Sequence, residues 1–190
     1  MDIRAHNRRA WDSEVDIGNE YTVPVSSETI SRARKGDWDI YLTPKTPVPK
    51  SWWPPLKGAR VLCLASGGGQ QGPILSAAGA KVTVYDNSPK QLGQDRKVAD
   101  RDCLSIELVE GDMADLSHFS NLSFDLIVNP ASTMFSEKVL PVWRESFRAL
   151  DHGGVLVIKG AFADGKPLLA IPNYARLNRG GRSIVWMKEQ

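Results

Sequence analysis

A glycine-rich segment in the first half of the chain has the spacing of a loop that binds a ligand through its backbone. Residues 67–72 read Gly-Gly-Gly-Gln-Gln-Gly, a G-x-G-x-x-G pattern between an apolar run and a helical stretch. Glycine lets the backbone turn sharply and approach a bound molecule closely. A tight turn between a strand and a helix explains the same residues, so the pattern alone does not decide between the two.

Polar side chains close the next three apolar runs of the chain. Asp86 follows the glycines at about the spacing of a carboxylate that accepts hydrogen bonds from the two hydroxyls of a ribose. Asp112 can accept a bond from an adenine amino group, and the neighbouring Met113 can cover the ring. Asn129 and the proline after it end the last of these runs. Helix caps, turns, core packing and strand ends are the structural explanations of the same residues.

The regular elements that carry these residues alternate between strands and helices. We predict strands over residues 61–65, 82–86, 106–110, 124–129 and 155–158, and helices over 73–78, 89–102 and 139–150. This alternation indicates a doubly wound α/β fold, with a mostly parallel sheet between layers of helices. The glycine segment and the three polar groups then all lie at the carboxyl ends of parallel strands, where such sheets bind ligands. Their common position favours a binding site over four unrelated turns.

Residues 1–58 differ from the rest of the chain. We expect helices over residues 5–16 and 27–35, followed by five prolines within residues 44–55. Four of the six tryptophans also lie in this segment. We predict that residues 1–58 form a helical, proline-rich cap over the substrate pocket, and that residues 59–190 form the α/β part of a single domain. Static packing of the tryptophans on the sheet remains open as the alternative.

Composition limits the partners and the compartment. The net charge of +2, from 24 basic and 22 acidic residues, gives no basis for binding nucleic acid or an anionic membrane. No apolar run approaches the length of a membrane span, and the N-terminus does not resemble a signal peptide. Cys63 and Cys103 lack metal-ligand spacing, so we expect no metal site. We expect a cytoplasmic protein with free thiols.

The chain resembles the class I S-adenosylmethionine (SAM)-dependent methyltransferases. Val61–Gly69, Val82–Asp86, Gly111–Met113 and Phe124–Asn129 look like motifs I to IV of that family, and segments at residues 10–12, 42–44 and 47–49 look like a little-characterised prokaryotic branch. The resemblance implies a Rossmann-like sheet of seven strands, SAM as cofactor, and methyl transfer, for which we expect a small-molecule acceptor. It implies cofactor contacts from Ala65, Ser66, Gly67, Gly68, Gly69, Asp86, Asn87, Asp112, Met113 and Asn129.

The sequence departs from this family at two places. Cys63 stands where the family often has an acidic residue, and Ala65 where it has its first glycine, so another residue or water must hold the SAM ammonium group. Only 31 residues follow Lys159, whereas the family adds a helix and two strands there. We predict that Pro167–Ala170 and Ile184–Trp186 form a short antiparallel pair beside the fifth strand. A compact variant, a truncated sheet and a frameshifted end all remain open.

Two other functions share parts of this pattern. A nicotinamide-dependent oxidoreductase also has the glycine motif and the acidic residue, but 190 residues leave little room for its catalytic domain. A non-catalytic SAM-binding or interaction protein on a methyltransferase scaffold also remains open. The sequence names no catalytic residue: His6 is the best placed histidine, and a base is needed only where the acceptor must lose a proton. The acceptor and the oligomeric state are left open.

Overall fold

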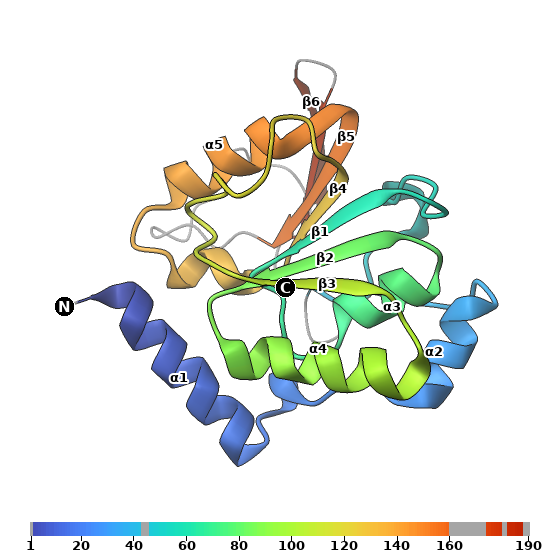
Figure 1. Ribbon diagram of the computed structural model, residues 1–190. Helices are drawn as coiled ribbons and strands as arrows, with labels where there is room; N and C mark the ends of the chain where they lie inside the picture. The colour runs from blue at the N-terminus through green and yellow to red at the C-terminus, as the bar shows by residue number, and fades with distance from the viewer. Residues whose placement is uncertain (1, 43–45, 160–173, 180–181, 188–190) are drawn as a thin grey trace.

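A seven-stranded sheet forms the centre of the molecule in the computed structural model, which describes residues 2–42, 46–159, 174–179 and 182–187 (Figure 1). Its strand order is β3-β2-β1-β4-β5-β7-β6. The strands are β1 Arg60–Leu64, β2 Lys81–Asp86, β3 Ile106–Glu110, β4 Phe124–Asn129, β5 Leu150–Lys159, β6 Tyr174–Arg179 and β7 Arg182–Met187. Strands β1 to β5 are parallel, which confirms the predicted α/β class.

Helices cover both faces of the parallel strands (Figure 1). Helices α3 (Gln71–Ala77) and α4 (Pro89–Asp102) pack on one face, and α5 (Val139–Ala149) packs on the other. Alternate residues of β1 enter the two resulting core layers, and Val61 to Leu64 are all fully buried. A continuous apolar run of this kind is what a central parallel strand requires, because both of its faces are covered.

Helix α4, which connects β2 to β3, begins where the sequence predicts. The Ser88 hydroxyl caps α4 by accepting a hydrogen bond from the backbone N–H of Gln91 at 3.1 Å, and Pro89 occupies the first helical position. Strand β5 differs from the prediction because it begins at Leu150, directly after α5. The two glycines at residues 153–154 therefore lie within β5 rather than in a turn before it, near a register irregularity between β4 and β5.

The N-terminal segment contains two helices with different environments. Helix α1 (Ile3–Ile17) begins at the cap residue Asp2 and ends at Gly18, whose φ of 71° is left-handed. Helix α2 (Ser27–Arg34) packs against α3 and buries Ile30 and Ala33, whereas α1 buries none of its residues. The proline-rich run after α2 contributes further apolar side chains to the core, including Val48 and Leu56. Of the predicted cap, then, α2 and the run after it are part of the core.

The C-terminal strands extend the sheet beyond β5. Strand β7 pairs with β5 in parallel, and β6 pairs with β7 in antiparallel orientation, so the predicted antiparallel pair beside the fifth strand is confirmed. The first member of the described pair is Tyr174–Arg179, whereas we predicted Pro167–Ala170. The pairing of β6 with β7 continues to Arg179 and Arg182. Pro167–Ala170 lies outside the described residues.

None of the helices in the described part of the chain is long and apolar enough to cross a membrane.

Candidate functional site

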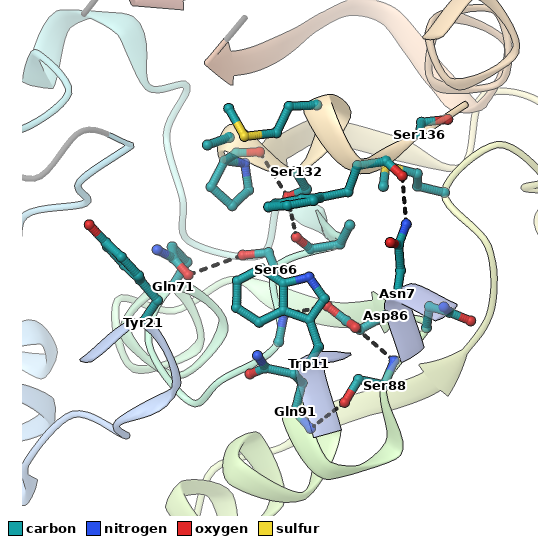
Figure 2. A pocket seen from close by; sticks show the side chains of 18 of the residues that line it. Asn7, Trp11, Tyr21, Ser66, Gln71, Asp86, Ser88, Gln91, Ser132 and Ser136 are labelled. Carbon is teal, nitrogen blue, oxygen red and sulfur yellow. Dashed lines mark hydrogen bonds between the residues drawn. The ribbon is translucent and has the colours of Figure 1, made fainter. Parts of the chain in front are cut away.

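A cavity of about 880 Å³ opens at the carboxyl ends of β1, β2 and β3, with α1 along one side (Figure 2). Seven of the ten predicted cofactor residues line it, and they come from three separate segments of the chain: Ala65, Ser66, Gly67, Asp86, Asn87, Asp112 and Met113. The other three, Gly68, Gly69 and Asn129, lie behind its wall and are buried. Parallel sheets bind ligands at the carboxyl ends of their strands (the strand-end rule), and most of these residues do meet there, as the sequence predicts.

The glycine loop after β1 is pressed against α4. Gly68 and Gly69 have φ angles of 115° and 74°, a region that side chains rarely adopt. A Cβ on Gly69 would lie 2.9 Å from the carbonyl oxygen of Gln94, and a Cβ on Gly67 would lie 2.7 Å from the Cβ of Gln91. At these positions, close packing on the helix accounts for the glycines without any ligand.

Asp86 links this loop to the start of α4. Its Oδ2 accepts a hydrogen bond from the backbone N–H of Gly67, and its Oδ1 accepts one from Ser88, both at 2.9 Å. Burial raises the pKa of Asp86, although these backbone donors oppose the shift. Because a carboxylate offers about four acceptor positions in all, Asp86 keeps capacity for further donors from the cavity.

The segment after β3 forms a compact turn at the adjoining wall. The Asp112 Oδ1 accepts a hydrogen bond from the backbone N–H of Ala114 at 2.9 Å. The residue before it, Gly111, has to be glycine, because the ring and hydroxyl of Tyr85 fill the space that a Cβ would need. Met113 packs on the core layer beside α5 and also lines the cavity. Asp112 is thus a turn residue and Met113 a partial core residue, and both still reach the cavity.

Asn129 has a structural role behind the loop. Its side-chain amide donates a hydrogen bond to the carbonyl oxygen of Leu64 at 2.8 Å, and only 1% of the residue is exposed. Three residues later, the Ser132 hydroxyl donates to the carbonyl oxygens of Ala65 and Pro130. These bonds tie the end of β4 to the end of β1 and set the position of the glycine loop.

Sequence reasoning missed many of the residues that line the cavity, and Trp11 and Gln91 are the two most relevant to ligand binding. Trp11 of α1 projects into its centre and lies edge-on to Phe135, with ring centroids 5.4 Å apart (Figure 2). Gln91 lies in the first turn of α4 with 4% exposure, and its Oε1 has no hydrogen-bond partner among the described residues. The sequence does signal Gln91, because the helix begins three residues after Asp86, at Pro89, and its first turn must face the same strand ends.

Helix α1 is attached to both rims of the cavity through polar side chains. Its partners are the end of β3, the turn between β2 and α4 and the first turn of α4 on one side, and the segment after β4 on the other. The contacts are Arg4–Asn87 (3.2 Å), Asn7 with the carbonyl oxygen of Phe135 (2.6 Å), Arg8–Glu110 (2.6 Å), Asp12–Ser88 (2.6 Å) and Asp16–Lys90 (2.6 Å). All of these side chains except the buried Ser88 are exposed or partly exposed, so water and salt compete for most of the contacts.

The histidines do not provide a base at this site. His6, His118 and His152 are all exposed, and none of them lines the cavity. Within the described ranges, no three His, Cys, Asp or Glu side chains are grouped closely enough to hold a metal ion. The groups that do line the cavity are backbone amides, carboxylates, amides and aromatic rings. They are suited to binding and orienting ligands.

The order of the five parallel strands and a ligand cavity at their carboxyl ends define a Rossmann-like methyltransferase fold. Residues 62–158 match the sequence model of the family described as "Methyltransferase domain". The chain therefore belongs to this family, within the class I SAM-dependent methyltransferase superfamily.

A relative from Bacillus subtilis shares much of the sequence. The chain is 59% identical over 153 residues to the "Uncharacterized methyltransferase YbaJ" of strain 168, over 80% of the chain. These residues span only 60% of the relative's own length. The family assignment therefore applies to the matched part, and it does not specify a substrate.

Two solved structures share the fold. A putative SAM-dependent methyltransferase from Methanococcus maripaludis aligns with a TM-score of 0.51 and 27% identity, over 56% of this chain and 49% of that one. The arsenic(III) SAM methyltransferase CrArsM from Chlamydomonas reinhardtii aligns with a TM-score of 0.52 and 23% identity, over 70% and 47% of the two chains. The second likeness concerns the fold alone.

Proposed function

We propose that this chain binds SAM in the cavity and transfers its methyl group to a small molecule. The observation that supports this most strongly is that three separate segments, predicted as cofactor contacts, line one cavity beside the glycine loop. In this proposal, Asp86 binds the ribose hydroxyls, Asp112 and Met113 bind the adenine, and Gly67 lies against the methionine part.

The polar groups of the cavity fit this cofactor. Asp86 already accepts two backbone hydrogen bonds and has capacity for the ribose hydroxyls. The Gln91 Oε1 is buried and unpaired in the described structure, so it offers an acceptor to a hydroxyl or ammonium donor. An unpaired buried acceptor is costly, and a ligand donor would offset that cost. Gln91 is thus a candidate for part of the role that the absent acidic residue at position 63 leaves open.

The rest of the cavity suits a small methyl acceptor. SAM, when bound, supplies a methyl group on a positively charged sulfur. The chain's contribution is to hold the acceptor close to it, since positioning provides much of the acceleration in such displacements. The aromatic side chains of Trp11, Tyr21, Tyr41 and Phe135 line the cavity and can fix an acceptor there. The whole cavity, at about 880 Å³, falls within the range of small-molecule sites, roughly 300–1,000 Å³.

Titration calorimetry with SAM and with NADH separates the candidate functions. Binding of SAM alone supports the proposal, whereas binding of NADH alone would indicate the oxidoreductase. Binding of neither ligand would favour an interaction protein on a methyltransferase scaffold. Transfer of the labelled methyl group of SAM to the low-mass fraction of a bacterial extract, and not to its protein or nucleic acid, then tests the proposed acceptor class.

A further inference from the structure

A buried carboxyl group lies directly beneath the glycine loop. Asp95 projects from α4 and is 0% exposed. Its Oδ2 accepts a hydrogen bond from the backbone N–H of Gly68 at 3.0 Å, and the carbonyl oxygen of Gln91 accepts from the same N–H at 3.1 Å. Helix α4 therefore holds Gly68 through one backbone and one side-chain acceptor.

This carboxyl group is a poor choice for stability alone. Its Oδ1 has no hydrogen-bond partner within the described part of the chain. A Cβ added to Gly72 would lie 3.2 Å from that oxygen, so the first turn of α3 packs closely against it. Leaving a buried polar atom unpaired is unfavourable, and an apolar side chain of similar size would avoid the cost. A role in shaping the loop explains why a carboxyl group stands here.

The surroundings of Asp95 point to an acceptor rather than an anion. Burial raises the pKa of Asp95 to about 8, and the neighbouring Asp86 raises it further, against the loop N–H groups of Gly69 and Gly68. Burial, and after it the neighbouring Asp95, raises the pKa of the Cys63 thiol on β1.

We propose that Asp95 is a positioning residue for the cofactor: by accepting the N–H of Gly68 it fixes the left-handed loop that presents Ala65 and Gly67 to SAM. The inference rests on the proposed function for the identity of the ligand. The anchoring of the loop is a property of the chain itself. Asp95 does not line the cavity, so it acts through the loop and does not touch the cofactor.

Two substitutions at this position separate the acceptor from the side-chain volume. Asp95→Asn keeps an oxygen that can accept from Gly68, whereas Asp95→Leu replaces it with an apolar group of similar size. In titration calorimetry we expect SAM affinity to fall by about tenfold or more in Asp95→Leu and to stay within about twofold of the original in Asp95→Asn. The melting temperature of Asp95→Leu should be unchanged or higher, because the unpaired buried oxygen is gone.

Hydrogen exchange of the Gly68 amide provides a readout that needs no ligand. It should be slow in the original chain and in Asp95→Asn, and faster in Asp95→Leu. Asp95→Ala serves as a second apolar variant if Asp95→Leu does not fold. Ser146→Ala, which removes a buried hydroxyl on the opposite face of the sheet, is the matched control and should alter neither exchange nor SAM affinity.

The outcomes are distinct. Equal protection of Gly68 in all variants would overturn the anchoring, and unchanged SAM affinity in Asp95→Leu would overturn the role in binding. Equal losses of SAM affinity in Asp95→Asn and Asp95→Leu would overturn the acceptor role, because they would show that the charge of Asp95 matters instead. If the original chain bound no SAM, the proposed function would fail, while the exchange data would still decide whether Asp95 anchors the loop.

Discussion

Helices α1 and α2 belong to the same N-terminal segment, yet they are held by different forces. Helix α2 buries Ile30 completely, while Ile17 of α1 is 72% exposed. Polar contacts at the rims of the cavity hold α1, together with the edge-on contact of Trp11 with Phe135. Apolar burial is worth more than exposed ion pairs, so α2 is part of the folded core and α1 is a peripheral cover.

This difference indicates how the cavity is reached. A helix held by exposed polar contacts can separate from its partners at little cost, because water replaces each hydrogen bond. A helix that buries apolar side chains cannot do so without loss of the core. We therefore expect any opening of the site to involve α1, while α2 and the following segment stay in place.

Truncation of one isoleucine in each helix should give the largest contrast. We expect Ile30→Ala to lower the free energy of unfolding by roughly 2–5 kcal/mol, the usual cost of such a cavity in a core. The matched change Ile17→Ala should alter it by less than about 0.5 kcal/mol. Urea unfolding of both variants measures this. Similar losses would mean that α1 is as firmly packed as α2.

A valine at Gly69 tests the junction between the loop, α4 and the N-terminal segment. Its Cβ would lie 2.9 Å from the carbonyl oxygen of Gln94 and 3.0 Å from Pro24, so the loop must move. We expect Gly69→Val to abolish SAM binding in calorimetry while the far-UV circular dichroism stays near native. Gly36→Val, at a glycine with the same sign of φ and no neighbour within 4 Å, controls for backbone strain. If Gly69→Val binds SAM normally, the loop is only a turn.

The pH dependence of stability tests whether the buried Asp95 of α4 holds its proton in the folded chain. Burial raises the pKa of Asp95 from 3.8 to about 8, so the folded chain keeps this proton where the unfolded chain releases it. The folded state then binds more protons, and this contribution to stability falls as pH rises from about 4 to about 8.

Asp95→Asn should reduce the fall of stability with pH. The unfolding free energy of the variant, relative to that of the original chain, should therefore increase as the pH rises. Asp86, whose pKa is also raised, leaves part of the slope in the variant. Urea unfolding of both chains at about pH 5 and about pH 8.5 measures the difference. Parallel curves would show that Asp95 titrates normally.

Removal of one exposed ion pair should have the smallest effect. Lys90 and Asp16 join α4 to α1 at 2.6 Å, and both side chains are about half exposed. We expect Lys90→Met to change the unfolding free energy by less than about 1 kcal/mol. Hydrogen exchange in α1 should become faster while exchange in α2 is unchanged, and added salt should have the same effect on the original chain. Slower or equal exchange in α1 would contradict the weak attachment.

Local patterns in the sequence were sufficient for most of the fold. The bounds of β3 and β4 and the start of α4 at Pro89 agree with the prediction, because apolar runs and the Ser88-Pro89 cap signal are encoded within a few residues. The first strand of the described C-terminal pair was not predicted, since a polar strand such as Tyr174–Arg179 has little apolar pattern to distinguish it from a turn.

The site was less predictable than the fold. The strand-end rule brought Asp86 and Asp112 to one cavity, but it does not indicate which side chains project into it and which lie behind it. Asn129 and Gly69 turned out to bond or pack within the wall. Trp11 reaches the cavity from a helix that is distant in sequence, and such long-range packing leaves no local pattern.

The most direct test of the account is SAM binding by the full chain and by its Asp86→Ala variant. Loss of the carboxylate should remove hydrogen bonds worth roughly 1.5–3 kcal/mol and weaken SAM binding by more than about tenfold. Asp100→Ala, at an exposed position of α4, is the control and should bind as the original chain does. Calorimetry should therefore give clear SAM binding in the original chain and in Asp100→Ala, with a large loss in Asp86→Ala alone. Equal SAM affinity in all three proteins would contradict the assignment of this cavity to the cofactor.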